Sequence, residues 1–179
     1  IACKYTEIYV ILQKRGDKIV SAAISFLKYM KVSISDTLNA IVNYAREEAM
    51  RTGSYMIGTD HLFLGILRHE ENLAAAHMKL LGIDLVDLKD FIDGKISEGR
   101  HIPYSDIDSI TLSRSTTNII NIAAFEATKS GCSVVGPQHL LLALCKAMAS
   151  YGTMYLREHG ITYDFLLDEF SKLGLLGGE

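Results

Sequence analysis

The chain has 179 residues, 49% of them hydrophobic, and a formal net charge of -3 at pH 7. It therefore has enough apolar material for the core of one medium-sized domain or two small, closely packed ones. The net charge excludes a general electrostatic field for nucleic acid. The three cysteines (Cys3, Cys132 and Cys145) lack CxxC spacing, which argues against a disulfide framework or a thiolate metal site and suits a reducing, cytoplasmic location.

Residues 1–34 form a basic extension, with six Lys or Arg against two acids, whereas residues 35–179 carry twelve against nineteen. From residue 17 to residue 30 the apolar residues recur at helical spacing, which predicts an amphipathic helix. Residues 5–12 are compatible with a short strand or a short helix. We expect the extension to pack onto the acidic remainder of the chain, and a separate docking role is the alternative.

The apolar residues of this extension raise the questions of a membrane span and of a dimer. Its longest apolar run, residues 19–32, is too short to span a membrane and is interrupted by Lys28 and Lys31, and nothing resembles a cleavable signal. A weak dimer through Phe26, Tyr29 and Met30 is a second possibility.

Two stretches of the chain, 78 positions apart, repeat one another. Ile57-Gly58-Thr59-Asp60-His61-Leu62-Phe63-Leu64-Gly65-Ile66-Leu67 is matched by Val135-Gly136-Pro137-Gln138-His139-Leu140-Leu141-Leu142-Ala143-Leu144-Cys145. The offset holds without a gap from Ser35/Ser113 to Ile92/Phe170, so one unit is used twice. The expected divisions are the extension at 1–34, repeat one at 35–93, a linker at 94–112, repeat two at 113–173, and a tail or linker at 174–179, with the two repeats forming one domain.

The pattern of apolar and capping residues predicts four helices in each repeat. The first begins at the N-cap Ser35 and ends before Gly53. The second begins at Gly58-Thr59-Asp60, or at Gly136-Pro137 in the later copy, and its apolar residues surround it almost completely, so we expect it to be buried at the centre of the repeat. Gly65 and Ala143 are small residues at matching positions and allow another helix to cross closely.

The third helix is predicted over residues 72–81, with Leu73, Ala76, Leu80 and Leu81 facing inward, and the fourth carries Leu85, Leu88, Phe91 and Ile92. Gly94, Gly99 and Pro103 mark the linker that follows. The chain is thus predicted to be all-α, with two tandem four-helix repeats related by a pseudo-twofold axis and an additional helical extension at the N-terminus.

The helix-start motif, the downstream Leu81-Gly82-Ile83 and their second copies resemble the double Clp repeat of the N-terminal domain of Clp-type AAA+ unfoldases. The similarity covers residues 33 to 173 and is nearest to the ClpC branch, in which the motif is usually Gly-Thr-Glu-His. The resemblance implies a non-catalytic protein-binding domain that receives substrates and adaptor proteins for an ATP-dependent unfoldase and protease, without a cofactor.

The chain has no Walker A sequence, because Gly94-Lys95 is followed by Ile96 and lacks the upstream glycine. The Clp ATPase ring and the peptidase therefore act in cis, on a continuation of the chain, or in trans, on a partner. The alternative is a freestanding Clp-repeat accessory protein that regulates or stabilises a Clp protease assembly, with the extension as a docking element. A Walker A motif downstream of Glu179 favours the first hypothesis, and a stop codon the second.

In the ClpC branch the acid of the helix-start motif is associated with recognition of phosphorylated arginine, so the resemblance implies a site at Ser35, Thr59 and Asp60. The chemistry is coherent, because a helix N-terminus attracts phosphate and a carboxylate pairs with guanidinium. The alternative is a structural Asp60 that only caps its helix. The second copy has Pro137-Gln138 instead, so we expect its site to be lost. For adaptor proteins, the candidate acidic residues are Glu47, Glu48, Glu70 and Glu71.

The histidines are better explained by structure than by catalysis or metal binding. His61, His69 and His77 recur at every eighth position, whereas a metal-binding pair on one helix face needs i,i+4 spacing, so no metal is expected. A Ser-His-Asp hydrolase is not favoured either, because the chain has no GxSxG elbow. We expect His61 and His139 to sit at buried helix starts and bond to backbone of the first helix, and Cys132 to be an inert thiol rather than a reactive one.

Overall fold

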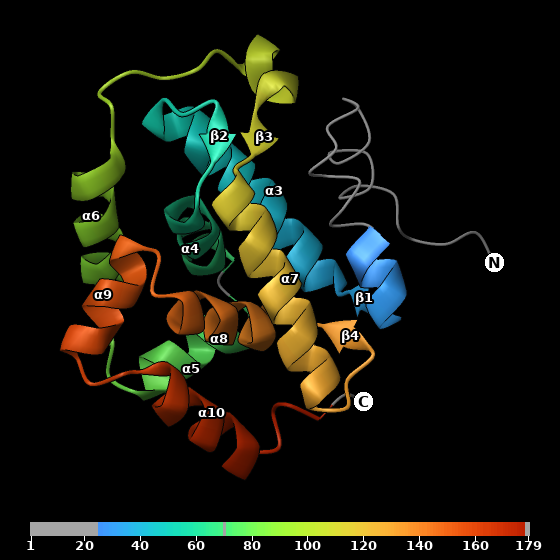
Figure 1. Cartoon of the computed structure of the whole chain (residues 1–179). Coiled ribbons are helices and arrows are strands. Elements are labelled where there is room, and N and C mark those ends of the chain that lie inside the picture. The colour runs from blue at the N-terminus through green and yellow to red at the C-terminus, as the bar shows by residue number, and fades with distance from the viewer. Residues whose placement is uncertain (1–24, 70, 178–179) are drawn as a thin grey trace.

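The two repeats have the same order of elements in the computed structural model, which describes residues 25–69 and 71–177 (Figure 1). Each helix and strand of the second repeat begins 78 positions after its counterpart in the first. The elements of the first repeat are β1 (Ser33–Ile34), α3 (Asp36–Thr52), β2 (Met56–Ile57), α4 (Thr59–Arg68), α5 (Leu73–Leu80) and α6 (Leu85–Ile96). Those of the second are β3 (Thr111–Leu112), α7 (Arg114–Lys129), β4 (Val134–Val135), α8 (Pro137–Ala147), α9 (Tyr151–Glu158) and α10 (Tyr163–Lys172).

The helices begin and end where their capping residues are. Ser35 and Ser113 accept hydrogen bonds from the backbone nitrogens of Leu38 and Thr116, both at 3.1 Å. Gly53 closes α3 in the left-handed conformation at φ 92°, a conformation that glycine adopts without steric cost. The all-α prediction of two tandem four-helix repeats is confirmed.

Two short parallel strand pairs exchange backbone hydrogen bonds between the repeats. β1 pairs with β4 and β2 pairs with β3, with Ser33 opposite Val134 and Met56 opposite Thr111. The two pairs are related by the same 78-residue offset, which is the pattern that a pseudo-twofold axis produces. These strands were not predicted, because two residues have no measurable periodicity.

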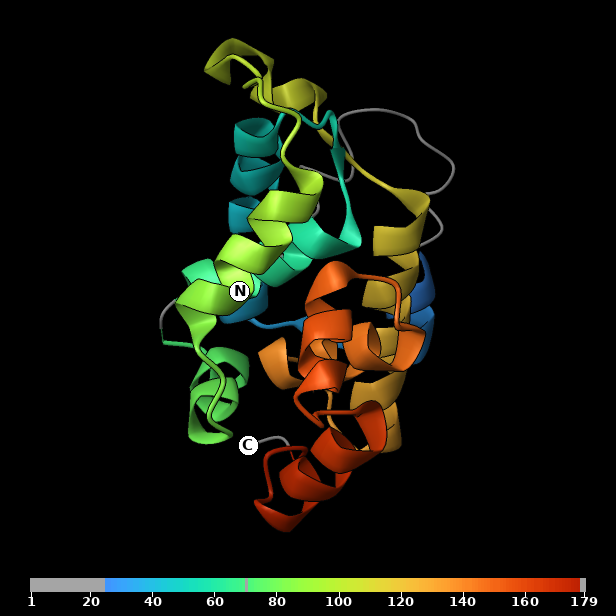
Figure 2. The same ribbon diagram turned by 90° about the vertical axis from the view of Figure 1, so that its left-hand side faces the viewer.

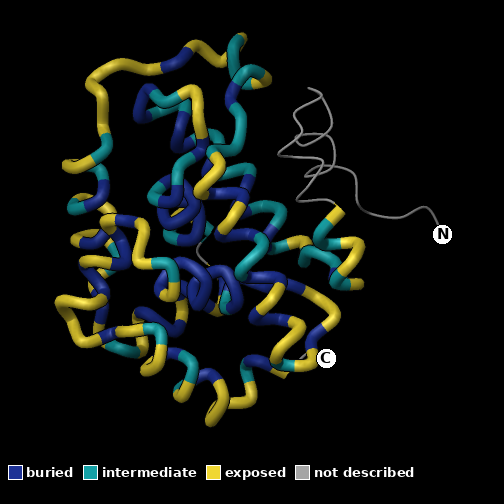
Figure 3. The backbone as a smooth tube through the Cα atoms, viewed as in Figure 1, coloured by how far each residue is buried: buried dark blue, intermediate teal, exposed yellow. Residues whose placement is uncertain are grey.

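The central helices α4 and α8 are buried almost throughout, as predicted (Figure 3). Gly65 is necessary at its position in α4, since a Cβ atom there would lie 2.4 Å from the carbonyl oxygen of Ile41 in α3. α4 also contacts α7, α8 and α9 of the second repeat. The two repeats therefore share one hydrophobic core.

The prediction for the inward face of α5 is wrong for Leu73, Ala76 and Leu80. All three are exposed, and Leu81 is only partly buried. The buried residues of this helix are Ala74, Ala75, His77 and Met78. Because α5 is apolar on both sides, the spacing of its hydrophobic residues does not determine which side faces the core.

The segment between the repeats is shorter than the predicted linker and is held by backbone hydrogen bonds. α6 continues through Gly94 to Ile96, past the expected linker start. Glu98 and Ile102 then donate backbone hydrogen bonds to the carbonyl oxygens of Thr52 and Met50, both at 3.0 Å. A 3-10 helix, η1 (Tyr104–Ser109), leads into β3.

Only the end of the N-terminal extension belongs to the described residues. Residues 25–30 are helical, and Phe26 and Met30 pack against the core, whereas Tyr29 is exposed. The predictions for residues 5–12 and for most of the helix at 17–30 lie outside the described residues, and the dimer stays a prediction. Within the part that the structure describes, no helix has the length and apolar character needed to cross a membrane.

Candidate functional site

The helix start of the first copy joins the two repeats. The Thr59 hydroxyl donates a hydrogen bond to the carbonyl oxygen of Ala149 at 2.7 Å. The Asp60 carboxylate accepts hydrogen bonds from the backbone nitrogen of Gly152, at 3.1 Å, and from that of Tyr151. Asp60 thus stabilises the N-terminus of α9, where the helix dipole is positive, rather than capping only its own helix.

Burial raises the pKa of Asp60 to about 6, against the opposing effect of the two backbone hydrogen bonds. The carboxylate is therefore mostly ionised at pH 7. Only part of its hydrogen-bonding capacity is used, since an ionised carboxylate has about four acceptor positions. Asp60 as a whole is neither fully buried nor exposed.

The predicted grouping of Ser35 with Thr59 and Asp60 is wrong. Thr52, at the opposite end of α3 from Ser35, bonds to His61 of the same helix start. The 17 residues of α3 separate its two ends by roughly 25 Å. Ser113 of the second repeat lies beside the motif instead, because its backbone nitrogen bonds to the carbonyl oxygen of Ile57 at 3.1 Å.

Each helix start is therefore accompanied by the N-cap serine of the other repeat. The Thr116 hydroxyl also donates to the carbonyl oxygen of Ile57, at 2.6 Å, and the Ser113 hydroxyl bonds to those of Ser115 and Thr116. Ser35 takes the equivalent place beside the second motif, with its nitrogen 3.0 Å from the carbonyl oxygen of Val135. Sequence spacing alone does not reveal this exchange, which depends on the strand pairing.

In the second copy, the C-terminal segment lies against the helix start. The Gln138 amide donates to the carbonyl oxygen of Leu175 at 3.2 Å, and the buried thiol of Cys132 donates to that of Leu176. Cys145 is also buried, which raises the pKa of its thiol to about 12. Both described cysteines are thus covered by the fold.

His61 and His139 stabilise the N-termini of the central helices. Their Nδ1 atoms accept hydrogen bonds from the backbone nitrogens of Gly58 and Gly136, at 2.8 and 3.0 Å. Nε2 of His61 therefore carries the proton and donates to the Thr52 hydroxyl at 2.9 Å. The expected bond to backbone of the first helix is wrong: the backbone partner is each histidine's own N-cap glycine, and only the Thr52 side chain comes from α3.

Both rings are neutral at pH 7. Burial lowers the pKa of His61 to about 4, although Glu48 acts in the opposite direction. The pKa of His139 is lowered to about 4 for the same reason, with Glu126 opposing. A neutral ring is required because Nδ1 must accept the glycine hydrogen bond.

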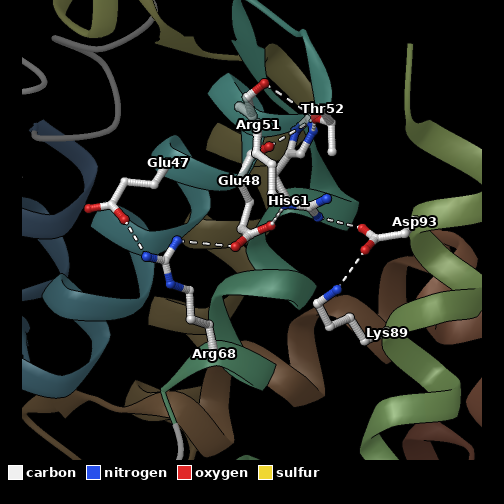
Figure 4. Close-up of polar contacts among 9 residues, drawn as sticks. Glu47, Glu48, Arg51, Thr52, His61, Arg68, Lys89 and Asp93 are labelled. Carbon is white, nitrogen blue, oxygen red and sulfur yellow. Dashed lines mark hydrogen bonds and ion pairs between the residues drawn. The ribbon is translucent and has the colours of Figure 1, made fainter. Parts of the chain in front are cut away.

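Glu48 is the buried carboxylate of an ion-pair network and not part of an exposed acidic face (Figure 4). It bonds to Arg51 at 2.7 Å and to Arg68 at 3.2 Å, so it connects α3 to the end of α4. Its predicted place on an exposed adaptor-binding surface is wrong for this reason. Glu47 is half-exposed and pairs with Arg68 at 2.7 Å, Glu71 is exposed, and Glu70 lies outside the described residues.

The network continues to the fourth helix through Asp93. Arg51 and Lys89 bond to its carboxylate at 2.5 and 2.7 Å. Burial opposes the ionisation of Asp93, but the hydrogen bonds from Lys89 and Arg51 outweigh it and hold its pKa below the ordinary value. The first, second and fourth helices of repeat one are thereby tied together.

The second repeat preserves the centre of this network with different partners. Glu126, at the position of Glu48, bonds to Lys146 at 2.5 Å and accepts a hydrogen bond from the Tyr163 hydroxyl at 3.0 Å. Lys146 occupies the position of Arg68. These pairs were not predicted, although the sequence contains their signal: both copies keep an acid and a base at matching positions on adjacent helices.

The described residues contain no group of three or more His, Cys, Asp or Glu that could hold a metal ion. The polar side chains of the two helix starts form most of their hydrogen bonds with backbone groups, and these bonds fix the orientation of the side chains.

Comparison with known proteins identifies similar sequences. Residues 33–159 match the family described as Clp repeat (R) N-terminal domain. The chain is 28% identical over 122 residues to the chaperone protein ClpB of Oceanobacillus iheyensis and 29% identical over 122 residues to the negative regulator of genetic competence ClpC/MecB of Bacillus subtilis. Each alignment covers 68% of this chain and 15% of the relative. The chain thus spans less than a sixth of these relatives.

We expect Glu48→Ala to lower the free energy of unfolding by about 2 kcal/mol. The value is below that for a fully buried pair, because Arg51 and Arg68 are partly exposed and regain some hydration. The matched control, Glu47→Ala, removes a half-exposed ion pair and should cost at most about 0.5 kcal/mol. Urea denaturation measures both, and equal losses would contradict the assigned role of Glu48.

The depressed histidine pKa values predict acid sensitivity. Between about pH 6.5 and pH 4 the unfolded chain binds protons at His61 and His139 that the folded chain does not, so stability falls as the pH falls. Asp60 acts oppositely, because its raised pKa makes the folded chain bind the extra proton between its ordinary value of 3.8 and about 6. Burial also lowers the pKa of His77, which therefore acts in the same direction as His61 and His139. With three histidines against one aspartate, we expect a net loss of about 2 kcal/mol or more from pH 7 to pH 5.

Urea denaturation at the two pH values measures this loss. The double variant His61→Gln/His139→Gln should lose much less stability between them, whereas Asp60→Asn should lose more. A pH dependence that is the same in all three proteins would refute the assignment.

Proposed function

The chain belongs to the Clp repeat N-terminal domain family, and from this premise we propose that it is a protein-binding domain that receives substrates and adaptor proteins for a ClpC-like ATP-dependent unfoldase. The observation that carries the proposal is the family match over residues 33–159, together with relatives that are named as a chaperone and as ClpC/MecB. In this proposal the domain is non-catalytic and cytoplasmic, and the ATPase ring and the peptidase act in cis or in trans.

The geometry supports a binding role. The acid and the histidine of the helix start, Asp60 and His61, bond to backbone groups of α9 and of the α4 N-cap. His61 is buried and neutral at pH 7, and its two nitrogens are both engaged. Neither ring nitrogen is therefore available as a general base.

We expect the immobilised chain to retain a permanently unfolded protein, such as a reduced and carboxymethylated one, more strongly than the same protein in its native, disulfide-bonded form. Unfolded chains expose the apolar segments that a substrate-receiving domain binds. Retention is measured by surface plasmon resonance at physiological salt. Equal retention of the two forms, or none of either, would contradict the proposed function.

Recognition of phosphorylated arginine stays a prediction, but the geometry changes which residues would form the binding site. The phosphate would meet the N-terminus of α7 with Ser113, and the guanidinium would use the acceptor positions of Asp60 that Gly152 and Tyr151 leave available. Thr59, whose hydroxyl donates to Ala149, borders this composite site, and Ser35 is outside it.

Calorimetry measures the equilibrium binding of phosphoarginine. We expect Ser113→Ala and Asp60→Ala each to weaken the affinity for phosphoarginine by about tenfold or more, which corresponds to the loss of about one charge-assisted hydrogen bond. Ser35→Ala, a change of the same kind at the equivalent N-cap, is the matched control and should have no effect. Equal affinity of the wild-type chain for arginine and phosphoarginine would contradict the prediction.

A further inference from the structure

The third helix of each repeat carries exposed apolar side chains at the same positions. On α5, Leu73 is 47% and Leu80 is 81% exposed, with Ala76 exposed between them. On α9, Tyr151 and Met154 occupy the positions of Leu73 and Ala76, and they are 39% and 49% exposed. Exposed apolar side chains therefore recur at two matching positions of these helices, whereas Glu158 stands at the position of Leu80 in α9.

Packing within the domain does not account for these side chains. α5 already buries Ala74, Ala75 and Met78 on its inner side, and α9 buries Tyr155 and Leu156. Side chains one or two positions away thus fill the core. Large apolar side chains on the opposite side of the same short helices expose hydrophobic surface that folding does not use.

The helices that carry these side chains, α5 and α9, lie on the same side of the molecule as the fourth helices α6 and α10 (Figure 2). α9 packs against α6, where the Tyr155 hydroxyl bonds to Asp87 and its ring lies 5.4 Å from that of Phe91. α5 meets α10, where the rings of His77 and Phe170 are 4.8 Å apart. Exposed residues of α5, α6, α9 and α10 together form what we call the outer helix face, which includes the exposed Val86 and Phe165.

The segments that contribute to the outer helix face are acidic. Residues 71–96 and 151–173 contain nine acids and five bases, a net charge of -4, which exceeds that of the entire chain, -3. Two of the five bases, Lys89 and Lys172, are in ion pairs with Asp93 and Asp168 of the same helices. Asp93 is also paired with Arg51 of α3, which leaves these segments a net charge of -3 with Arg51 counted. A ligand for this face must therefore complement both apolar side chains and negative charge.

We propose that the outer helix face is a docking surface for a basic, apolar segment of a partner protein, in which leucine-like side chains are interspersed with Lys or Arg. Leu73, Leu80, Tyr151 and Met154 contact its apolar side chains, and the surrounding carboxylates attract its cations. Methionine and tyrosine suit such a surface, because the first adapts to different shapes and the second has a large contact area with few rotatable bonds. The inference rests on the proposed function and specifies the surface and the partner chemistry.

The test uses a short synthetic amphipathic peptide of Leu and Lys, and a Leu and Glu peptide of the same spacing as the counter-probe. Fluorescence anisotropy measures their binding to the full chain. We expect the Leu/Lys peptide to bind and the Leu/Glu peptide to bind at least about tenfold more weakly. Two double variants, which we call the stripe pairs, remove the apolar side chains without a change in net charge: Leu73→Gln/Leu80→Gln and Tyr151→Gln/Met154→Gln. Each should weaken binding of the Leu/Lys peptide by about tenfold or more.

The matched control is Tyr104→Gln/Phe125→Gln, which removes two exposed aromatic side chains from η1 and α7. This pair should bind the Leu/Lys peptide as the wild type does, and circular dichroism establishes that all three variants are folded. Equal weakening in the control pair, or unchanged binding in both stripe pairs, would overturn the proposal. A dimer that the stripe substitutions dissociate would also overturn it, because a second copy would then occupy the face.

Retention of the unfolded protein is measured on the same variants. If wild type retains it while the stripe pairs bind the Leu/Lys peptide normally, only the docking surface is refuted. If wild type retains no unfolded protein, the proposed function fails whatever the peptide does.

Discussion

The central helix of each repeat is apolar around nearly all of its circumference, and a single repeat has too few helices to cover it. α4 is covered by α3 and α6 of its own repeat and by α7, α8 and α9 of the other. Burying both central helices in one core removes apolar surface from water that either repeat alone would expose. The exchanged strand pairs and the mutual placement of Ser35 and Ser113 follow from this requirement, because they bring each helix start to the other repeat.

The buried polar groups can be understood from the same constraint. A helix that begins inside a shared core has backbone nitrogens that water does not reach, so side chains must satisfy them. His61 and His139 do this for their N-cap glycines, and Asp60 does it for α9. At the other end of each central helix, Glu48 and Glu126 pair with the basic residues in its last turn, Arg68 and Lys146. These groups fix how the helices are aligned, at the cost of acid sensitivity.

The repeat offset, the helix starts, the capping serines and the buried central helices could all be predicted from the sequence, because each depends on local spacing and capping chemistry. Three features could not. The inward side of α5 depends on which helices cover it, since Leu73 and Ala75 are equally suited to a core. Glu48 looks like a surface residue until Arg51 and Arg68 are placed beside it. The partner of Asp60 lies 92 positions away, at Gly152, and only the fold brings it there.

The two copies differ most where Thr59-Asp60 is replaced by Pro137-Gln138, and the structure changes what that difference means. Thr59 and Asp60 form hydrogen bonds across the repeat interface, whereas Gln138 bonds to the C-terminal segment. Divergence at this position is therefore accounted for by different internal neighbours, without requiring a ligand in either copy. The outward positions of α5 and α9 show the opposite pattern: their residues differ, yet both copies keep exposed apolar side chains that have no role in folding. Surface that folding does not explain is stronger evidence for a partner than polar side chains that folding already employs.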